Sequence, residues 1–364
     1  MQLPHRPLLL DGGLGTLLEA RGHDLSDPLW SARVLADEPT AVRAAHAEYF
    51  RAGADVAITA SYQVGFEAFA ARSLTHADTE ALLRASVRLA AEARDEVART
   101  DPPGARRERW IAASVGPLGA TLGDGSEYRG STGLDRAGLR RWHAPRFAVL
   151  ADAGADLLAC ETIPSLDEGR ALVDLARGSG ASAWLAFTIA GGRLRSGEPM
   201  AEGFRLAEEA DEVVAVGINC AHPEEVPAAI AAARSVTDRP VVVYPNSGER
   251  WDAVARGWGG DPGVPDARAW IDAGATLVGG CCRVGPDAIR RMRDAVGRGR
   301  RRIMPPSPGG RNHPRPNRGS AARRRRARPW ASPGSVAEHL PADAEPSHRA
   351  PRDRERDGCS TSNR

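Results

Sequence analysis

The feature that most restricts the fold of this chain is a regular alternation of short apolar segments with longer amphipathic ones, which continues to about residue 302. Apolar runs rich in Val, Ile, Leu and Ala that alternate with amphipathic stretches favour parallel strands joined by helices. We predict eight strands, at residues 7–11, 54–61, 109–116, 155–161, 183–188, 212–220, 240–245 and 275–281.

Helix-like segments lie between and after these runs, at residues 39–52, 78–99, 134–153, 165–177, 201–209, 223–235, 265–273 and 286–296. Several end in Ala-Gly-Ala, as at Ala52-Gly53-Ala54, where a glycine just past a helix turns the chain into the next strand. Eight strand–helix units predict a (β/α)8 barrel, the TIM barrel. A doubly wound open sheet is the alternative, but no Gly-x-Gly-x-x-Gly turn with a following acidic residue comes after the first strand.

The composition changes near residue 303, where the amphipathic pattern ends and a segment rich in Pro and Arg begins. Residues 298–364 contain 17 Arg and 6 acidic residues, a net charge of +11, whereas residues 1–297 carry −9. A segment of this composition buries too little apolar surface to offset the entropy of ordering it. We therefore predict a barrel over residues 1–302 and a disordered, Arg/Pro-rich tail over residues 303–364.

The partners expected from composition are few. Arg323–Arg326 could neutralise the phosphates of a nucleic acid, but a solvated extension is the more usual role of such a charge run, and we favour it. No apolar run approaches the roughly 20 residues of a membrane-spanning helix, and residues 1–6 lack the apolar stretch of a signal peptide. We expect a cytoplasmic protein with no membrane or nucleic-acid partner, and no obligate protein partner is implied.

The cysteines point to a metal. Five in 364 residues are too few for a disulfide scaffold, yet Cys220, Cys281 and Cys282 lie at the ends of the sixth and eighth predicted strands. In a parallel barrel these ends share one rim, where active sites form. Three thiolates with an open fourth position are typical of catalytic Zn²⁺, since sulfur ligands select it over Mg²⁺ or Ca²⁺. A strand-end cysteine can also be a small core residue, as we expect for Cys160.

Other strand ends carry polar and glycine-rich motifs. They are Asp11-Gly12-Gly13-Leu14-Gly15-Thr16, Gly116-Pro117-Leu118-Gly119-Ala120, Asp124-Gly125-Ser126-Glu127-Tyr128-Arg129-Gly130, Glu161-Thr162-Ile163-Pro164, Gly217-Ile218-Asn219-Cys220, Tyr244-Pro245-Asn246-Ser247-Gly248-Glu249 and Gly279-Gly280-Cys281-Cys282-Arg283. Together, over residues 8–297 and in collinear order, they resemble the homocysteine S-methyltransferase family. The loop 124–130 is most similar to the branch that uses S-methylmethionine.

The resemblance implies methyl transfer from a sulfonium donor, S-methylmethionine or S-adenosylmethionine, to L-homocysteine, which forms methionine. Cys220, Cys281 and Cys282 match the family's zinc ligands, and the homocysteine sulfur takes the fourth position. Metal coordination removes the proton of a thiol that is otherwise mostly protonated at neutral pH, so no general base is needed.

The amino acid end of homocysteine needs its own contacts. By the same resemblance Asp11 and Glu161 bind its ammonium group, while N–H groups of Gly12 and Gly13 could bind its carboxylate. Asn219 is expected to position the substrate or to orient a ligand. Alternatively, Asp11 caps the helix that follows it, and Glu161 pairs with an arginine at the rim.

The donor site is the least determined part. Candidates are Asp124, Glu127, Tyr128 and Arg129 in the loop after the third strand, and Trp258 or Trp251 after the seventh, whose rings could face the sulfonium cation. A glycine-rich acidic loop can equally be solvated surface, and Trp258 a packing anchor.

Three other functions stay open at this point. A metal-dependent barrel hydrolase would use histidines and carboxylates, but none of the nine histidines lies in a strand-end motif. A methyltransferase module could use betaine, or a methylfolate with a partner protein. A nucleic-acid-binding protein driven by the tail is the non-enzymatic alternative.

Overall fold

The computed structural model describes residues 3–4, 6–24, 30–102, 107–130, 132–252, 257–259, 263 and 265–298. All of these belong to one compact unit, Met1–Pro305. The tail predicted for residues 303–364 lies outside the described residues, so its disorder and its boundary remain predictions.

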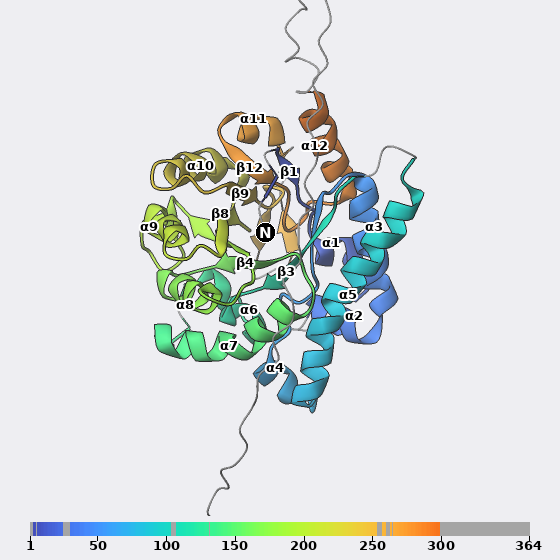
Figure 1. Cartoon of the computed structure of the whole chain (residues 1–364), viewed down its shortest axis with the longest axis vertical. Helices are drawn as coiled ribbons and strands as arrows, with labels where there is room; N and C mark the ends of the chain where they lie inside the picture. Colours follow the sequence, from blue (N-terminus) through green and yellow to red (C-terminus); the bar gives the residue numbers. More distant parts are fainter. Residues whose placement is uncertain are drawn as a thin grey trace, which may run out of the picture. The chain divides into compact units, whose positions relative to one another are not determined.

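Eight parallel strands close into a barrel at the centre of this unit (Figure 1). Their order in the sheet is β1-β12-β9-β8-β5-β4-β3-β2, and a parallel bridge between Leu10 and Val56 joins the two end strands. The strands are β1 (Leu8–Leu9), β2 (Val56–Ile58), β3 (Trp110–Val115), β4 (Leu157–Ile163), β5 (Ala183–Phe187), β8 (Val213–Asn219), β9 (Val241–Tyr244) and β12 (Ala275–Val278). Each overlaps one predicted run, which confirms the (β/α)8 barrel and excludes the open sheet.

Helices surround the strands (Figure 1). They are α1 (Leu14–Ala20), α2 (Trp30–Asp37), α3 (Pro39–Ala52), α4 (Phe66–Ala70), α5 (His76–Thr100), α6 (Leu118–Leu122), α7 (Arg136–Asp152), α8 (Leu166–Ala176), α9 (Met200–Arg205), α10 (Val226–Arg234), α11 (Ala267–Asp272) and α12 (Pro286–Arg298). The glycines of the three Ala-Gly-Ala segments, Gly53, Gly154 and Gly274, all have the left-handed backbone expected just past a helix.

Several short hairpins and 3-10 segments form in addition to the main strands and helices. Two antiparallel hairpins form, β6 (Ile189–Ala190) with β7 (Arg193–Leu194) and β10 (Arg250–Asp252) with β11 (Gly257–Gly259). The 3-10 segments are η1 (Ser126–Tyr128), η2 (Leu206–Glu208) and η3 (Pro223–Glu225). Segments η2 and η3 fall within the helices predicted at residues 201–209 and 223–235. The two hairpins and η1 are too short to show a periodic pattern in the sequence, which is why periodicity did not predict them.

The strands separate two apolar layers. Along β4, Leu158 and Cys160 belong to the outer core shared with the helices, whereas Leu157 and Ala159 belong to the barrel interior. This alternation follows from the period of two in a strand. Trp184 and Tyr244 fill the interior with aliphatic side chains around them. Because the interior is packed, ligands meet this barrel at its rim.

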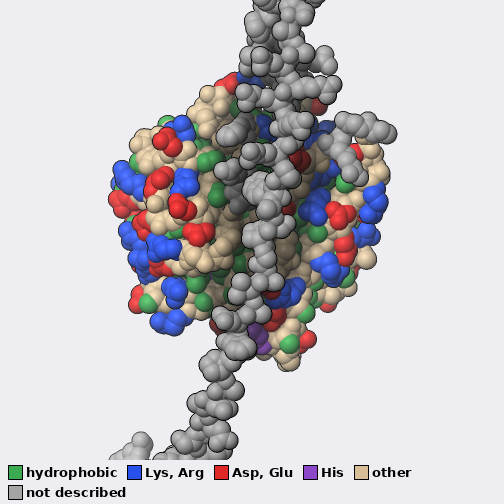
Figure 2. Space-filling view, viewed as in Figure 1, with side chains coloured by type: hydrophobic (Ala, Val, Ile, Leu, Met, Phe, Trp, Pro, Cys, Tyr) green, Lys and Arg blue, Asp and Glu red, His purple; other side chains and the backbone are tan. Residues whose placement is uncertain are grey.

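The outer helices carry charges of both signs. On the face drawn in Figure 2, arginines and acidic side chains are interspersed over the flanking helices. Ion pairs such as Arg136–Asp174 and Arg84–Glu80 connect them. Within the described ranges, no helix combines the length and the apolar character needed to cross a bilayer.

Candidate metal centre

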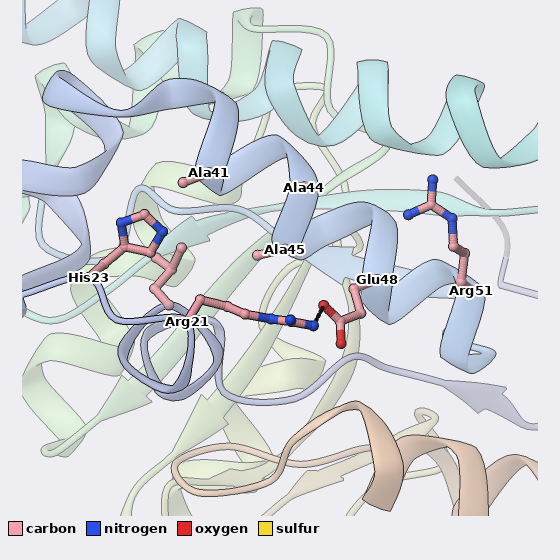
Figure 3. Close-up of a pocket in the computed structure, with 8 residues that line it drawn as sticks. Arg21, His23, Ala41, Ala44, Ala45, Glu48 and Arg51 are labelled. Atoms are coloured by element: carbon pink, nitrogen blue, oxygen red, sulfur yellow. Dashed lines mark hydrogen bonds and ion pairs between the residues drawn. The ribbon is translucent and has the colours of Figure 1, made fainter.

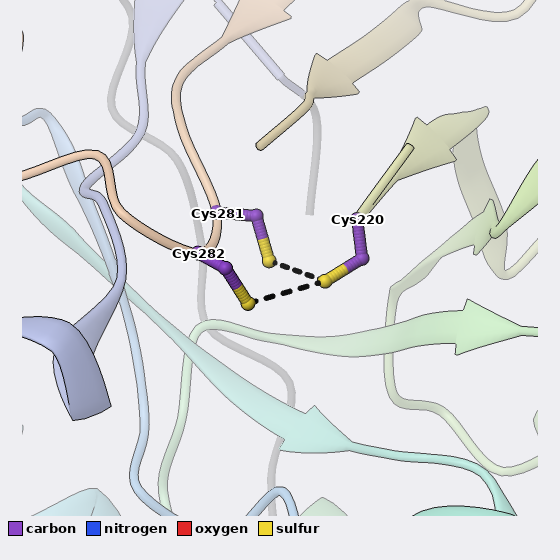
Figure 4. A group of neighbouring side chains, drawn as sticks. All are labelled: Cys220, Cys281 and Cys282. Atoms are coloured by element: carbon purple, nitrogen blue, oxygen red, sulfur yellow. Dashed lines mark hydrogen bonds between the residues drawn. The ribbon is translucent and has the colours of Figure 1, made fainter. Parts of the chain in front are cut away.

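Three cysteine thiols meet at the carboxyl ends of β8 and β12 (Figure 4). Cys220 immediately follows β8, and Cys281 and Cys282 lie in the loop after β12. The Cys220 Sγ atom is 2.9 Å from Cys281 Sγ and 3.6 Å from Cys282 Sγ, and all three sulfur atoms lie within 4.8 Å of one another. The barrel therefore brings together residues that are 61 positions apart in the chain.

This donor set fits a tetrahedral thiolate metal such as zinc. Zn–S bonds of about 2.3 Å place sulfur atoms about 3.8 Å apart, so the Cys220–Cys282 distance already suits the ion and the Cys220–Cys281 pair must open by less than an ångström. Hydrogen bonds from the other two thiols lower the pKa of Cys282, whereas the bonds of Cys281 to Cys220 and Cys282 raise the pKa of Cys281. The cluster therefore favours a thiolate at Cys282 over one at Cys281.

Glycines let the cysteine loop pack closely on the first strand. A Cβ atom on Gly280 would lie 2.1 Å from the Val284 side chain, and one on Gly12 would lie 2.0 Å from the Val284 carbonyl oxygen. Neither approach is possible for a larger residue without a backbone shift. The Gly13 N–H donates to this same carbonyl at 3.0 Å. It is therefore engaged within the protein, which corrects its predicted role as a carboxylate donor.

Asp11 lies beneath the cysteine loop and is 1% exposed. Its Oδ2 atom accepts the Ile58 N–H at 2.9 Å, and Oδ1 is buried with no hydrogen-bond partner among the described residues. Burial raises the pKa of this carboxyl well above its ordinary value. Helix α1 begins at Leu14 with Gly13 as N-cap and no side-chain cap bond, so Asp11 does not cap it.

Glu161 belongs to β4, and its carboxyl group lies near the same rim of the barrel. It accepts a short hydrogen bond from the Ser114 hydroxyl and interacts with the Tyr244 side chain. Burial raises its pKa to about 7. The indole N–H of Trp184 donates to the Tyr244 hydroxyl at 3.0 Å, so a chain of buried polar groups supports the carboxylate from inside the barrel. No ion pair of Glu161 with an arginine occurs in the part of the chain described.

Tyr244, Trp184 and Thr162 complete the site and were not among the predicted site residues. Tyr244 and Trp184 occur in strands that are otherwise apolar, and a buried aromatic residue with a polar atom usually requires a partner. That signal could have marked them. Thr162 forms two hydrogen bonds with Asn219, both internal to the protein. Asn219 thus lies next to Cys220, with its amide turned toward β4.

The predicted donor residues divide into two groups. The Tyr128 hydroxyl lies 3.4 Å from Cys220 Sγ, and the Arg195 guanidinium stacks over the Tyr128 ring at 5.4 Å. Glu127 has a buried Oε2 atom without a hydrogen-bond partner in the described ranges, and burial raises its pKa. Asp124 and Arg129 instead pair with each other at 2.8 Å on the surface.

Trp258 and Cys160 are the remaining predicted residues. Trp258 is on β11, opposite Trp251 of β10, and its side chain is outside the described part. Cys160 packs in the outer core, where burial raises its pKa to about 12. His222, two residues after Cys220, caps η3. A surface hollow of about 440 Å³ between α1 and α3, crossed by the Arg21–Glu48 ion pair, contains none of the predicted residues (Figure 3).

Comparison with known proteins identifies the family. The model of the family described as homocysteine S-methyltransferase matches residues 8–296. The chain belongs to the homocysteine S-methyltransferase family. A homocysteine S-methyltransferase of Escherichia coli is 45% identical over 294 residues, which cover 79% of this chain and 94% of the relative. A selenocysteine methyltransferase of Astragalus bisulcatus is 42% identical over 307 residues, covering 78% and 91%.

A solved structure agrees with this family membership. The metallated form of the homocysteine methyltransferase MmuM from Escherichia coli superposes with a TM-score of 0.71 at 43% identity, over 80% of this chain and 96% of that one. The family match over residues 8–296 spans all eight strands of the barrel. The family match ends at residue 296, before the predicted tail begins.

Proposed function

We propose that this member of the family transfers a methyl group from a sulfonium donor, S-methylmethionine or S-adenosylmethionine, to L-homocysteine and so forms methionine. The observation that carries the proposal is the cluster of three thiols beside two buried carboxyl groups on one rim. The relatives named for homocysteine methylation, and the metallated form of one of them, support it.

Cys220, Cys281 and Cys282 would hold zinc, which supplies a Lewis acid that binds the homocysteine sulfur as a thiolate at neutral pH. Three cysteine thiolates outweigh the charge of a divalent cation, so the substrate sulfur keeps nucleophilic character. The thiols are of the soft type that zinc prefers over hard oxygen-binding cations.

The carboxyl groups of Asp11 and Glu161 would bind the substrate ammonium. Both are buried, and burial raises the pKa of each because the ionised form loses its hydration. An ammonium placed between them supplies a countercharge and restores the ionised forms. The Gly12 N–H group is the remaining candidate for the substrate carboxylate.

The transfer itself requires alignment more than proton movement. An electron pair of the homocysteine sulfur forms the new bond to the methyl carbon, and the bond from this carbon to the donor sulfonium breaks. The pair of that bond stays on the donor sulfur, which leaves as a neutral thioether. Glu127 and Tyr128 would face the donor cation; the closeness of the Tyr128 hydroxyl to Cys220 and the burial of the Glu127 carboxyl support this role.

A donor panel tests the proposal. The zinc-loaded protein is incubated with carbon-13-labelled homocysteine and, separately, S-methylmethionine, S-adenosylmethionine, betaine or methyltetrahydrofolate. Mass spectrometry then distinguishes methionine made from the labelled acceptor from methionine left when S-methylmethionine loses a methyl group. We expect labelled methionine with a sulfonium donor. If labelled methionine forms only with betaine or methyltetrahydrofolate, the proposed sulfonium donor is wrong. If no donor gives labelled methionine, the proposed function is refuted.

A further inference from the structure

Asn219 and Thr162 form a reciprocal pair of hydrogen bonds across the rim. The Thr162 backbone N–H donates to Asn219 Oδ1 at 2.6 Å, and Asn219 Nδ2 donates to the Thr162 hydroxyl at 2.7 Å. Both residues are almost completely buried. β5 lies between β4 and β8 in the sheet, so this pair connects two strands that are not neighbours.

Each partner is next in sequence to a proposed site residue, and each of these two places contains a residue with left-handed backbone. Thr162 follows Glu161 and has φ of 57°, while Asn219 precedes Cys220, which has φ of 49°. Left-handed backbone is disfavoured for residues other than glycine, and especially for a β-branched residue such as threonine. At Thr162 the register between β4 and β5 also shifts, between Cys160 and Ile163. Something must hold this turn, because the preferred extended backbone would redirect Glu161.

Further bonds at the strand ends converge on the same place. The Thr188 N–H, just past β5, donates to the Ile163 carbonyl at 3.0 Å, and its hydroxyl donates to the Cys220 carbonyl at 3.3 Å. The Tyr62 side chain hydrogen-bonds the Thr162 side chain. The loop after β2 and the ends of β4, β5 and β8 thus meet at Thr162 and Thr188. Asn219 bonds both the backbone and the side chain of Thr162.

We infer that Asn219 is a positioning residue, which holds Thr162 in its left-handed turn and thereby keeps Glu161 and Cys220 in register. The inference rests on the proposed function in one respect: Glu161 binds the substrate ammonium and Cys220 binds the metal. It gives Asn219 a structural role within the protein and not a contact with the substrate, since the carbonyl oxygen and the NH₂ group of its amide both already have hydrogen-bond partners.

Metal binding by the reduced, metal-free protein provides a test that does not depend on turnover. Cd²⁺ alone is titrated in competition with a chelator, and the thiolate-to-cadmium absorption band reports occupancy of the cysteines. Asn219→Ala should lower the affinity for Cd²⁺ roughly 10- to 100-fold, as loss of an outer-shell partner commonly does. Ser86→Ala, which removes a buried hydrogen bond to the Leu83 carbonyl on α5, is the control and should bind Cd²⁺ like wild type.

The left-handed turn itself is tested by glycine, which adopts such a backbone without strain. Thr162→Gly retains the N–H that bonds Asn219 and should bind Cd²⁺ nearly as wild type. In the T162G background, Asn219→Ala should lower the affinity for Cd²⁺ by no more than about threefold, because the turn no longer needs the Asn219 amide. A loss equal to that in the wild-type background would overturn the inference.

Steady-state kinetics give a second readout. N219A should raise KM for homocysteine and leave KM for the donor within about twofold, because Glu161 and not the donor loop is displaced. If N219A does not fold, Thr162→Val takes its place, since it removes the hydroxyl bonds to Asn219 and Tyr62 and keeps the N–H that donates to Asn219. Unchanged Cd²⁺ affinity in T162V would overturn the inference, and Tyr62→Phe, which removes the Tyr62 bond alone, is its control. A wild-type protein that binds no Cd²⁺ would instead overturn the proposed metal centre.

Discussion

Replacing Glu161 by glutamine should stabilise the fold and damage the site. The carboxyl is buried, and burial raises its pKa from the ordinary 4.5 to about 7. At about 1.4 kcal/mol per pKa unit, this difference corresponds to at most about 3.5 kcal/mol. The folded state binds the extra proton between these two pH values, so stability is lost as pH rises through this window. Above about pH 7 the ionised Glu161 carboxylate lowers the free energy of unfolding by the full amount, and below about pH 4.5 this loss of stability is absent.

Glu161→Gln removes this titration while it keeps the size of the side chain. Urea unfolding of the reduced, metal-free protein is measured from pH 5 to pH 8.5, with Glu67→Gln as an exposed control. The free energy of unfolding of E161Q should exceed that of wild type by a small amount at pH 5, and this difference should grow toward about 1–3 kcal/mol above pH 7. The E67Q difference should stay within about 0.5 kcal/mol at every pH.

The same variant should lose affinity for homocysteine. A hydrogen bond to a charged partner contributes roughly 1.5–3 kcal/mol, so KM for homocysteine should rise about 10- to 150-fold. Two results would refute the reasoning. A stability difference that does not change with pH would show that burial leaves the carboxyl pKa near its ordinary value, and an unchanged KM would show that Glu161 does not bind the substrate.

Three further outcomes are expected. Cys281→Ser should lower the zinc content measured by elemental analysis and abolish methionine formation, and full zinc occupancy with full activity in this variant would contradict the three-thiolate centre. Deletion of residues 303–364 should leave methylation of homocysteine intact, because the family match ends at residue 296, whereas loss of activity would give the tail a role in the enzyme. Peroxide should inactivate the enzyme with release of zinc, because thiolates are the form that oxidants attack; activity that resists peroxide would argue against thiolate ligands.

Local periodicity was sufficient to predict the architecture. Each of the eight strands overlaps an apolar run, and the turns at Gly53, Gly154 and Gly274 follow from the same helix-ending signal. Strand and helix periods are properties of a few consecutive residues, so they can be read without the fold. The cluster of Cys220, Cys281 and Cys282 was also predictable, because the carboxyl ends of parallel strands meet on one rim.

Hydrogen-bond partners were decided only by the tertiary structure. Gly13 donates to Val284, Asn219 bonds Thr162, and Asp124 pairs with Arg129. The sequence made each of them a candidate for the substrate or donor site and left a structural role open for Asn219 and a surface position open for Asp124 and Arg129. These pairings depend on strand register, on closure of the barrel and on the exact path of the loops. Polar atoms take the nearest partner once water is excluded, and which partner is nearest is set by residues far away in the chain. The sequence by itself therefore determined the barrel and its cluster of three cysteines, while the fold decided which polar atoms remain free for a substrate.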